Sequence, residues 1–213
     1  MAQTITEPVT ARGSGGGADV LEPGFGDYGK GGDGARRLET AKLGLWVAMG
    51  SISMLFAAFT SAYIVRSAGG DWVPLEFPPI LWWNTAILLL SSVTMEISRR
   101  SFHRWQPITF RKWLLVTGVL GAAFLVGQLF AWRELARQGI YLVSHPHSSF
   151  FYVLTAVHGV HLLAGVLALF YVLSLALKYR LTPGESSSPS IAATYWHFVD
   201  GLWLYLMVVL FYL

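Results

Sequence analysis

Five apolar segments, each long enough to cross a membrane, constrain the fold of this 213-residue chain more than any other feature. A membrane-spanning helix needs about 20 apolar residues, because it rises about 1.5 Å per residue through a hydrocarbon core about 30 Å thick. Continuous apolar runs of this length predict helices rather than the strands of a barrel. The sequence therefore predicts an all-α integral membrane protein, a five-transmembrane-helix bundle. The expected helices lie near residues 42–65, 80–98, 113–132, 150–177 and 191–213.

The composition agrees with a membrane protein. Hydrophobic residues make up 54% of the chain and charged residues only 13%, which is too apolar for an ordinary soluble domain of this length. The absence of cysteine excludes disulfides, thiolate metal sites and a cysteine nucleophile. The net charge of +3 is small and the charges lie between the apolar runs, so they indicate membrane topology and no nucleic-acid partner.

Residues 1–38 differ from the rest of the chain. They are rich in glycine, mix acidic with basic side chains and contain no long apolar run. Such a segment cannot bury enough apolar surface to offset the entropy that is lost on ordering. We therefore expect a disordered, glycine-rich cytoplasmic tail at 1–38, followed by a five-helix membrane domain at 39–213.

The basic residues predict the orientation of the helices. Twelve of the 15 lysines and arginines lie in the tail or at the start of the first expected helix, between the second and third expected helices, or between the fourth and fifth. The others, Arg66, Arg133 and Arg137, lie on the opposite side. Under the positive-inside rule, the N-terminus is cytoplasmic and the C-terminus is outside. Glu96 and Glu134 lie near helix ends beside arginines, and we expect both to form interfacial ion pairs.

Polar side chains inside the apolar segments are the candidate functional residues. A charged group such as Asp200 costs about 2.5–3.5 kcal/mol near the middle of a membrane helix, unless it is paired, protonated or turned toward other helices. His197 and Asp200 are three residues apart and share a helix face, as do His158, His161 and Gly165. We expect these groups to hydrogen-bond between helices. The predicted structural polar network consists of His158, His161, His197, Asp200 and Gln128.

Small and aromatic residues accompany these polar groups. Glycine lets helix backbones approach closely in a membrane, where packing drives association. We therefore expect close helix contacts at five positions, which are Gly159, Gly165, Gly201, Trp196 and Trp203.

Two other classes of function compete with a structural role for these polar residues. The first alternative is a metalloenzyme, because histidines and a carboxylate are ligands of zinc and iron. The expected helix ends, however, place His161 about 24 Å and Asp200 about 14 Å from the inner boundary of the membrane. That difference is too large for one ion, so we expect no metal in this chain, and the sequence indicates no catalytic residue. A proton or solute carrier with Asp200 and His197 as a relay is the second alternative, although the sequence shows no inverted repeat.

Two motifs near the C-terminus carry a family resemblance. Residues 150–165 have the sequence FFYVLTAVHGVHLLAG, and residues 195–203 have the sequence YWHFVDGLW. They resemble the penultimate-helix and last-helix signatures of subunit III of haem-copper oxidases. Asn84-Thr85 with Ser91-Ser92 resembles that family's central-helix pattern. The resemblance covers about residues 43–213, with all five segments in order, and it is to the short five-helix form that is usual in bacteria.

The resemblance implies a subunit of a cytochrome c oxidase in the bacterial plasma (inner) membrane. In this family the haem and copper lie in subunits I and II. Subunit III binds neither, packs mainly against subunit I, supports proton uptake and carries phospholipids. We therefore expect no cofactor bound by this chain apart from phospholipids, and partners that are subunit I, subunit II and membrane lipids.

The chain departs from the family pattern at two positions. The family often has a carboxylate in the helix that matches 42–65, where this chain has Ser53, and an acid shortly after the glutamine of the third helix, where it has Ala131. The resemblance therefore carries no proton-linked role to those positions. The same motifs are also similar to those of subunit III of a quinol oxidase and of an accessory membrane protein of nitric oxide reductase. Both stay open as alternatives to a cytochrome c oxidase subunit.

Overall fold

The computed structural model describes residues 28–69, 78–144, 146–178, 181 and 188–212, with side chains from residue 39 onward. The described part of the chain contains five helices. All five are long and apolar enough to span a membrane, which confirms the predicted all-α class and the number of spans. The helices are α1 (Tyr28–Ser67), α2 (Ile80–His103), α3 (Pro107–Arg137), α4 (Pro146–Leu177) and α5 (Ser188–Tyr212).

Most of the helices extend past the ends that hydropathy predicts. α3 continues from residue 132 to Arg137, and α2 continues from residue 98 to His103. Adding a residue to an existing helix needs no new nucleus, so a helix continues into the polar boundary until a turn ends it. α1 likewise begins at Tyr28, inside the segment predicted as a tail. The rest of that predicted tail, residues 1–27, lies outside the described residues.

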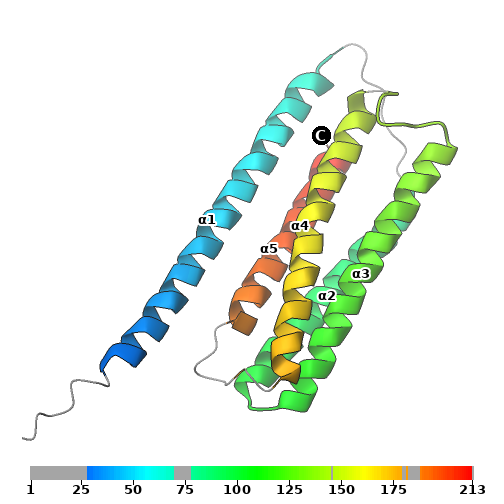
Figure 1. Ribbon diagram of the computed structural model, residues 1–213. Coiled ribbons are helices and arrows are strands. Elements are labelled where there is room, and N and C mark those ends of the chain that lie inside the picture. Colours follow the sequence, from blue (N-terminus) through cyan, green and yellow to red (C-terminus); the bar gives the residue numbers. More distant parts are fainter. Residues whose placement is uncertain (1–27, 70–77, 145, 179–180, 182–187, 213) are drawn as a thin grey trace, which may run out of the picture. The chain divides into compact units, whose positions relative to one another are not determined.

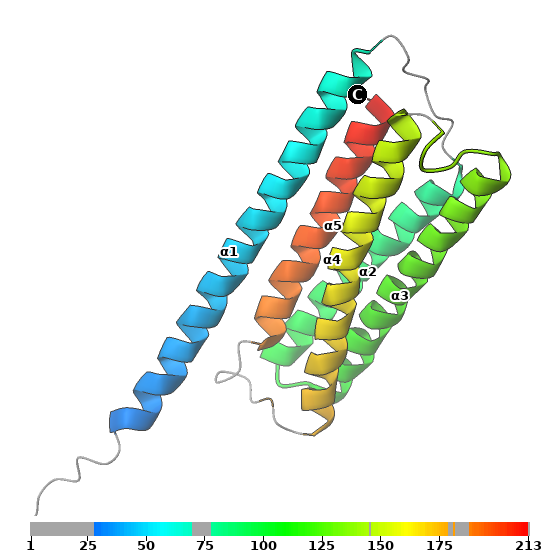
Figure 2. The same ribbon diagram turned by 45° about the horizontal axis from the view of Figure 1, so that its top comes forward.

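Helices α2 to α5 form an antiparallel bundle (Figure 1, Figure 2). Each of the four packs against two others, in the cyclic order α2, α3, α4, α5 and back to α2. The centre of the bundle is filled by side chains that are at most 1% exposed, among them Phe124, Leu162, Trp196, Trp203 and Leu206. We call the end where α2 ends and α5 begins the basic end, because it carries Arg99, Arg100 and Arg111, and the other end the opposite end.

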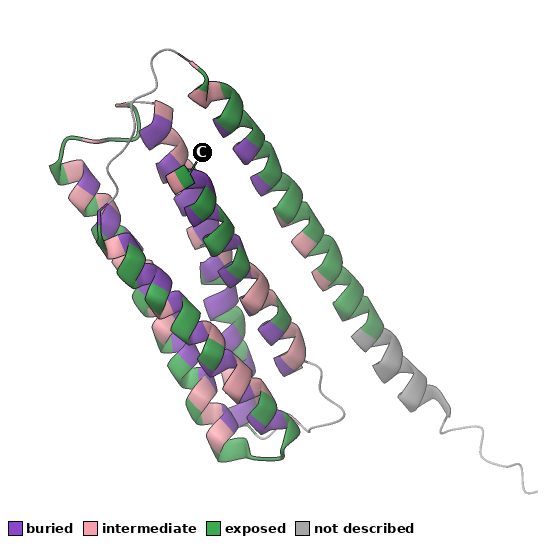
Figure 3. Cartoon of the chain, turned by 180° about the vertical axis from the view of Figure 1, so that it is seen from behind, coloured by how far each residue is buried: buried purple, intermediate pink, exposed green. Residues whose placement is uncertain are grey.

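From residue 39 onward, α1 contacts α4 and α5 through one narrow stripe. Phe56, Thr60 and Tyr63, spaced at i, i+4 and i+7, are its buried residues. Tyr63 contacts the rings of His147 and Phe150 on α4, and the hydroxyl of Tyr205 on α5 donates to Thr60 Oγ1 at 2.8 Å. Most other described side chains of α1 are exposed (Figure 3), as expected of a helix that borders lipid or a partner.

Candidate functional site: polar side chains between the helices

Trp196 of α5 occupies the centre of the bundle near the basic end. Its side chain is 1% exposed, and Nε1–H donates to Ser91 Oγ on α2 at 3.1 Å. The ring lies against two glycines. A Cβ atom added to Gly121 on α3 would be 2.5 Å from Trp196 Cη2, and one added to Gly165 on α4 would be 3.3 Å from Trp196 Cε3. One indole therefore joins all four helices of the bundle, and glycine at 121 makes the space for it.

Trp203 repeats this arrangement two turns farther along α5. Its Nε1–H donates to Thr85 Oγ1 on α2 at 3.0 Å, and its ring meets Phe124 on α3 at a centroid distance of 4.8 Å. His158 on α4 lies 5.0 Å away, centroid to centroid. Two buried hydroxyls of α2 thus satisfy the two buried indole donors of α5, which fixes the register of these two helices.

His158 and Gln128 lie in the apolar core. His158 is 0% exposed and is enclosed by the rings of Phe124 and Trp203. Its two ring nitrogens, and both amide atoms of Gln128, have no hydrogen-bond partner among the described residues. One turn farther along α3, Trp132 Nε1–H donates to Thr155 on α4 at 3.1 Å. Trp132, a residue outside the predicted network, therefore makes a direct side-chain bond between α3 and α4.

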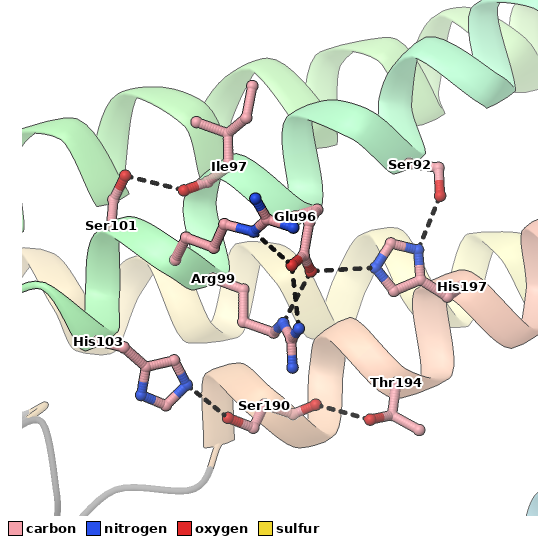
Figure 4. Close-up of polar contacts among 10 residues, drawn as sticks. Ser92, Glu96, Ile97, Arg99, Ser101, His103, Ser190, Thr194 and His197 are labelled. Carbon is pink, nitrogen blue, oxygen red and sulfur yellow. Dashed lines mark hydrogen bonds and ion pairs between the residues drawn. The ribbon is translucent and has the colours of Figure 1, made fainter.

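A second polar group lies at the basic end between α2 and α5 (Figure 4). His197 Nδ1 is 2.7 Å from the Ser92 hydroxyl, and His197 Nε2 is 3.9 Å from the Glu96 carboxylate. Glu96 also accepts hydrogen bonds from Arg99 and Arg100, each at 2.8 Å. The predicted ion pairing of Glu96 is confirmed, and so is that of Glu134, which pairs with Arg137 at 3.6 Å.

Asp200 lies one turn from His197 on the same helix and is only 4% exposed. Its two carboxylate oxygens have no hydrogen-bond partner among the described residues. The polar residues predicted from the sequence thus fall into separate groups. His197 contacts α2 directly, whereas His158, Gln128 and Asp200 are buried without a bond to another described helix.

His161 faces a different part of the molecule from His158. Its Nδ1–H donates to the carbonyl of Val157 in its own helix at 2.8 Å, and its ring meets Phe56 of α1 edge-on at a centroid distance of 5.9 Å. The hydroxyl of Tyr195 on α5 donates to the His161 carbonyl at 3.0 Å. The two histidines that the sequence places on one face therefore contact two different surfaces, the bundle core and α1.

The glycines differ in their surroundings. A Cβ atom at Gly165 would touch Tyr195 and Trp196, whereas one at Gly159 would have Leu125 as its nearest neighbour, at 4.0 Å, and one at Gly201 would meet nothing within 4 Å. The crowded positions are Gly121 and Gly127 of α3, which lie against Trp196 and Asn84 and are not among the predicted packing residues. The repetition of small residues in α3, at 118, 121 and 127, was the signal available.

The chemistry of this arrangement is that of helix packing. Among the described residues, no three histidine, aspartate or glutamate side chains converge as a metal site requires. The bonds that join different helices are indole, hydroxyl and imidazole contacts, each of which adds about 0.6–2 kcal/mol within a membrane.

Comparison with known proteins places this arrangement in a family. The family described as "Cytochrome c oxidase subunit III" matches residues 38–213, which include all five predicted spans. This chain belongs to that family. Its membership and its five hydrophobic helices make it a multi-pass membrane protein.

Individual relatives agree with the assignment. "Cytochrome c oxidase subunit 3" of Corynebacterium diphtheriae is 33% identical over 168 residues, covering 75% of this chain and 82% of the relative. "Probable cytochrome c oxidase subunit 3" of Mycobacterium bovis is 29% identical over 182 residues, covering 83% and 90%. "Cytochrome c oxidase subunit 3" of Bacillus sp. (strain PS3) is 28% identical over 176 residues, covering 79% and 84%. The recognition made from the two C-terminal motifs is thereby confirmed.

Proposed function

We propose that this chain is the non-redox subunit III of a proton-pumping terminal oxidase, a cytochrome c oxidase of aerobic respiration. In this role it supports the assembly, the stability and the proton uptake of the catalytic subunit. The observation that carries the proposal is the family match across residues 38–213, which spans the whole membrane part of the chain.

The proposed partners and location follow from the same assignment. Subunit I is the main contact and subunit II the second, and the haem and copper of the complex belong to those subunits. This chain holds no redox centre, and membrane phospholipids are its only bound small molecules. It lies in the bacterial plasma membrane with its N-terminus in the cytoplasm, an orientation supported by the twelve basic residues on one side.

The polar side chains have a structural role in this proposal. Trp196, Trp203 and His197 join α5 to α2 through Ser91, Thr85 and Ser92, and so hold the last helix in register. Asp200 has no hydrogen-bond partner among the described residues of this chain, so in this proposal its partner is a group of the assembled complex. A satisfied polar group in a low dielectric makes a rigid contact, and an orphaned one is costly.

Purification through a tag on this chain tests the proposed function. The expected result is copurification of a large haem-containing subunit and of a smaller subunit with a dinuclear copper centre, together with oxygen reduction by reduced cytochrome c. A copurifying complex without dinuclear copper that oxidises quinol would replace the proposal with a quinol oxidase. A complex that reduces nitric oxide would assign an accessory role there, and stoichiometric iron or copper on this chain alone would contradict the non-redox role.

A further inference from the structure

The three arginines of the opposite end each line a groove between helix ends. Arg66 lines a groove between α1 and α4, Arg133 lines one between α3 and α4, and Arg133 and Arg137 line a third at the ends of α2 and α3. These are also the only basic residues that the sequence places on that side of the membrane. The positive-inside rule disfavours basic residues there, so an arginine that lines a groove on this side and has no ion pair is a candidate to bind a ligand of opposite charge.

The groove between α3 and α4 has the shape of a lipid-chain site. Its volume is about 660 Å³, and its walls are mainly apolar and aromatic. Along α3 it extends from Val126 to Ala136, which is about 15 Å at 1.5 Å per residue. That length matches one leaflet, half of a hydrocarbon core about 30 Å thick. The lining residues are Val126, Leu129, Phe130, Trp132, Arg133, Ala136, Tyr141, Leu142 and Tyr152.

The walls of this α3–α4 groove are held in place by hydrogen bonds. Trp132 Nε1–H donates to Thr155 at 3.1 Å, and the Tyr152 hydroxyl donates to the carbonyl of Ile140 at 3.0 Å. Both aromatic side chains are therefore fixed before any ligand arrives. Tryptophan and tyrosine favour the depth of the lipid headgroups, which places the mouth of the groove at the membrane boundary.

Arg133 stands at this mouth as an exposed cation. Its guanidinium has no hydrogen bond and no ion pair among the described residues, whereas Arg137, on the next turn, pairs with Glu134 at 3.6 Å. A guanidinium matches the geometry of a phosphate and binds it through two parallel hydrogen bonds. The site therefore combines an apolar channel of leaflet length with an uncompensated positive charge at its mouth.

We infer that the α3–α4 groove binds an anionic phospholipid of the leaflet at the opposite end, with its phosphate on Arg133 and one acyl chain along Val126 and Leu129. The net positive charge at the mouth selects an anionic headgroup over a zwitterionic one. The site lies wholly within this chain, so it does not depend on which oxidase contains the chain.

The test is lipid binding to the complex that this chain forms in its membrane, purified in mild detergent and stripped of loose lipid. Native mass spectrometry counts bound phosphatidylglycerol and phosphatidylethanolamine per copy of the chain during titration with each lipid. Removing a charge-assisted hydrogen bond reduces affinity by about tenfold or more, so Arg133→Gln is expected to weaken phosphatidylglycerol binding by that factor. Arg133→Lys retains part of the affinity, and Leu129→Trp, which fills the exposed channel, lowers the binding of both lipids.

Arg137→Gln is the matched control, because it removes the same charge one turn away, outside the α3–α4 groove. It is expected to leave the phosphatidylglycerol affinity unchanged. Equal losses in the two glutamine variants would show unspecific attraction and overturn the inference. Unchanged binding in Arg133→Gln, or equal affinity for the two lipids in the unaltered chain, would also overturn it. If inorganic phosphate competes with phosphatidylglycerol for the site and Leu129→Trp does not change the lipid affinity, the ligand is a free anion and not a lipid.

Discussion

At the scale of single residues, the contact between Trp196 and Gly121 leaves the least room for change. A Cβ atom at position 121 would be 2.5 Å from Trp196 Cη2, a ring atom held by its own bond to Ser91. Gly121→Ala is therefore expected to destabilise the assembled complex by about 1–3 kcal/mol, the usual cost of overpacking. The measurement is the midpoint of thermal unfolding of the purified complex.

Gly159→Ala is the control for this prediction. The added Cβ atom would lie at ordinary van der Waals distance, 4.0 Å from Leu125, and alanine has the higher helix propensity. This variant is expected to be neutral or slightly stabilising. Combining Gly121→Ala with Trp196→Leu removes the ring that clashes, so part of the loss from Gly121→Ala should disappear in the double variant. Equal effects of the two alanines would show that the indole contact is not the cause.

Asp200 gives a second prediction at this scale. Asp200→Ala is expected to lower the yield of assembled complex by about threefold, because a destabilisation of 1–2 kcal/mol changes the amount of a protein in the cell several-fold. Turnover per purified complex is expected to stay near that of the unaltered chain. Thr194→Ala, which removes an exposed hydroxyl bonded only within its own helix, is the control. A normal yield with lower turnover would place Asp200 in proton transfer instead.

The sequence predicts the burial of a single residue well where its depth in the membrane alone determines that burial. It predicts the contacts of a residue poorly where those contacts depend on the register between helices. An aspartate or histidine in the middle of an apolar run must be buried or paired, and Asp200, His158 and Gln128 are buried. The partners of Trp196 and Trp203 depend on how α5 slides against α2, α3 and α4. That offset is set by packing of the complete bundle, so Ser91, Thr85 and Gly121 could not be selected as partners from the sequence.

At the scale of elements, α1 is held differently from the other helices. Only Phe56, Thr60 and Tyr63 are buried among its described side chains. Tyr63→Ala removes the ring contacts with His147 and Phe150, so α1 is expected to move more freely relative to α4. Because the chain contains no cysteine, spin labels can be attached at Met54→Cys on α1 and Val160→Cys on α4, both exposed positions.

The measured quantity is the distribution of distances between the two labels in the purified complex. Tyr63→Ala is expected to broaden it, whereas Ile64→Ala, which shortens an exposed neighbour on the same turn, is expected to leave it unchanged. An unaltered distribution in Tyr63→Ala would mean that other contacts, such as partner subunits, position α1.

Hydropathy predicted these elements to within a few residues at most ends. The centres of the five helices follow from the number of apolar residues that a bilayer requires. The ends do not, because hydropathy falls at Arg99 and Arg133 although the backbone stays helical there. Charged side chains at helix ends extend into the polar boundary, as the Glu96–Arg99 and Glu134–Arg137 pairs illustrate. The narrow attachment of α1 could not be predicted, because most of its exposed side chains are apolar too.

At the scale of the whole molecule, the number of spans and the distribution of charge predict the topology. One helix, α3, separates the connection after α2 from the connection before α4, so the two connections lie on opposite sides of the membrane. Gln106 in the first connection and Val143 in the second are both exposed. Gln106→Cys and Val143→Cys therefore report the two sides of a chain that otherwise has no thiol.

The positive-inside rule sets the expected result of that experiment. A maleimide that cannot cross membranes should label Val143→Cys in intact cells, and should label Gln106→Cys only after the membrane is opened. The charges at the basic end make inversion costly, because each Lys or Arg carried across the hydrocarbon core costs several kcal/mol. Labelling of both positions in intact cells would mean that α3 does not span the membrane. The reversed labelling pattern would mean that the chain is inverted in the membrane. The basic end, with His197 and Asp200, would then lie toward the outside and the Arg133 groove toward the cytoplasm. The lipid inferred in that groove would belong to the cytoplasmic leaflet.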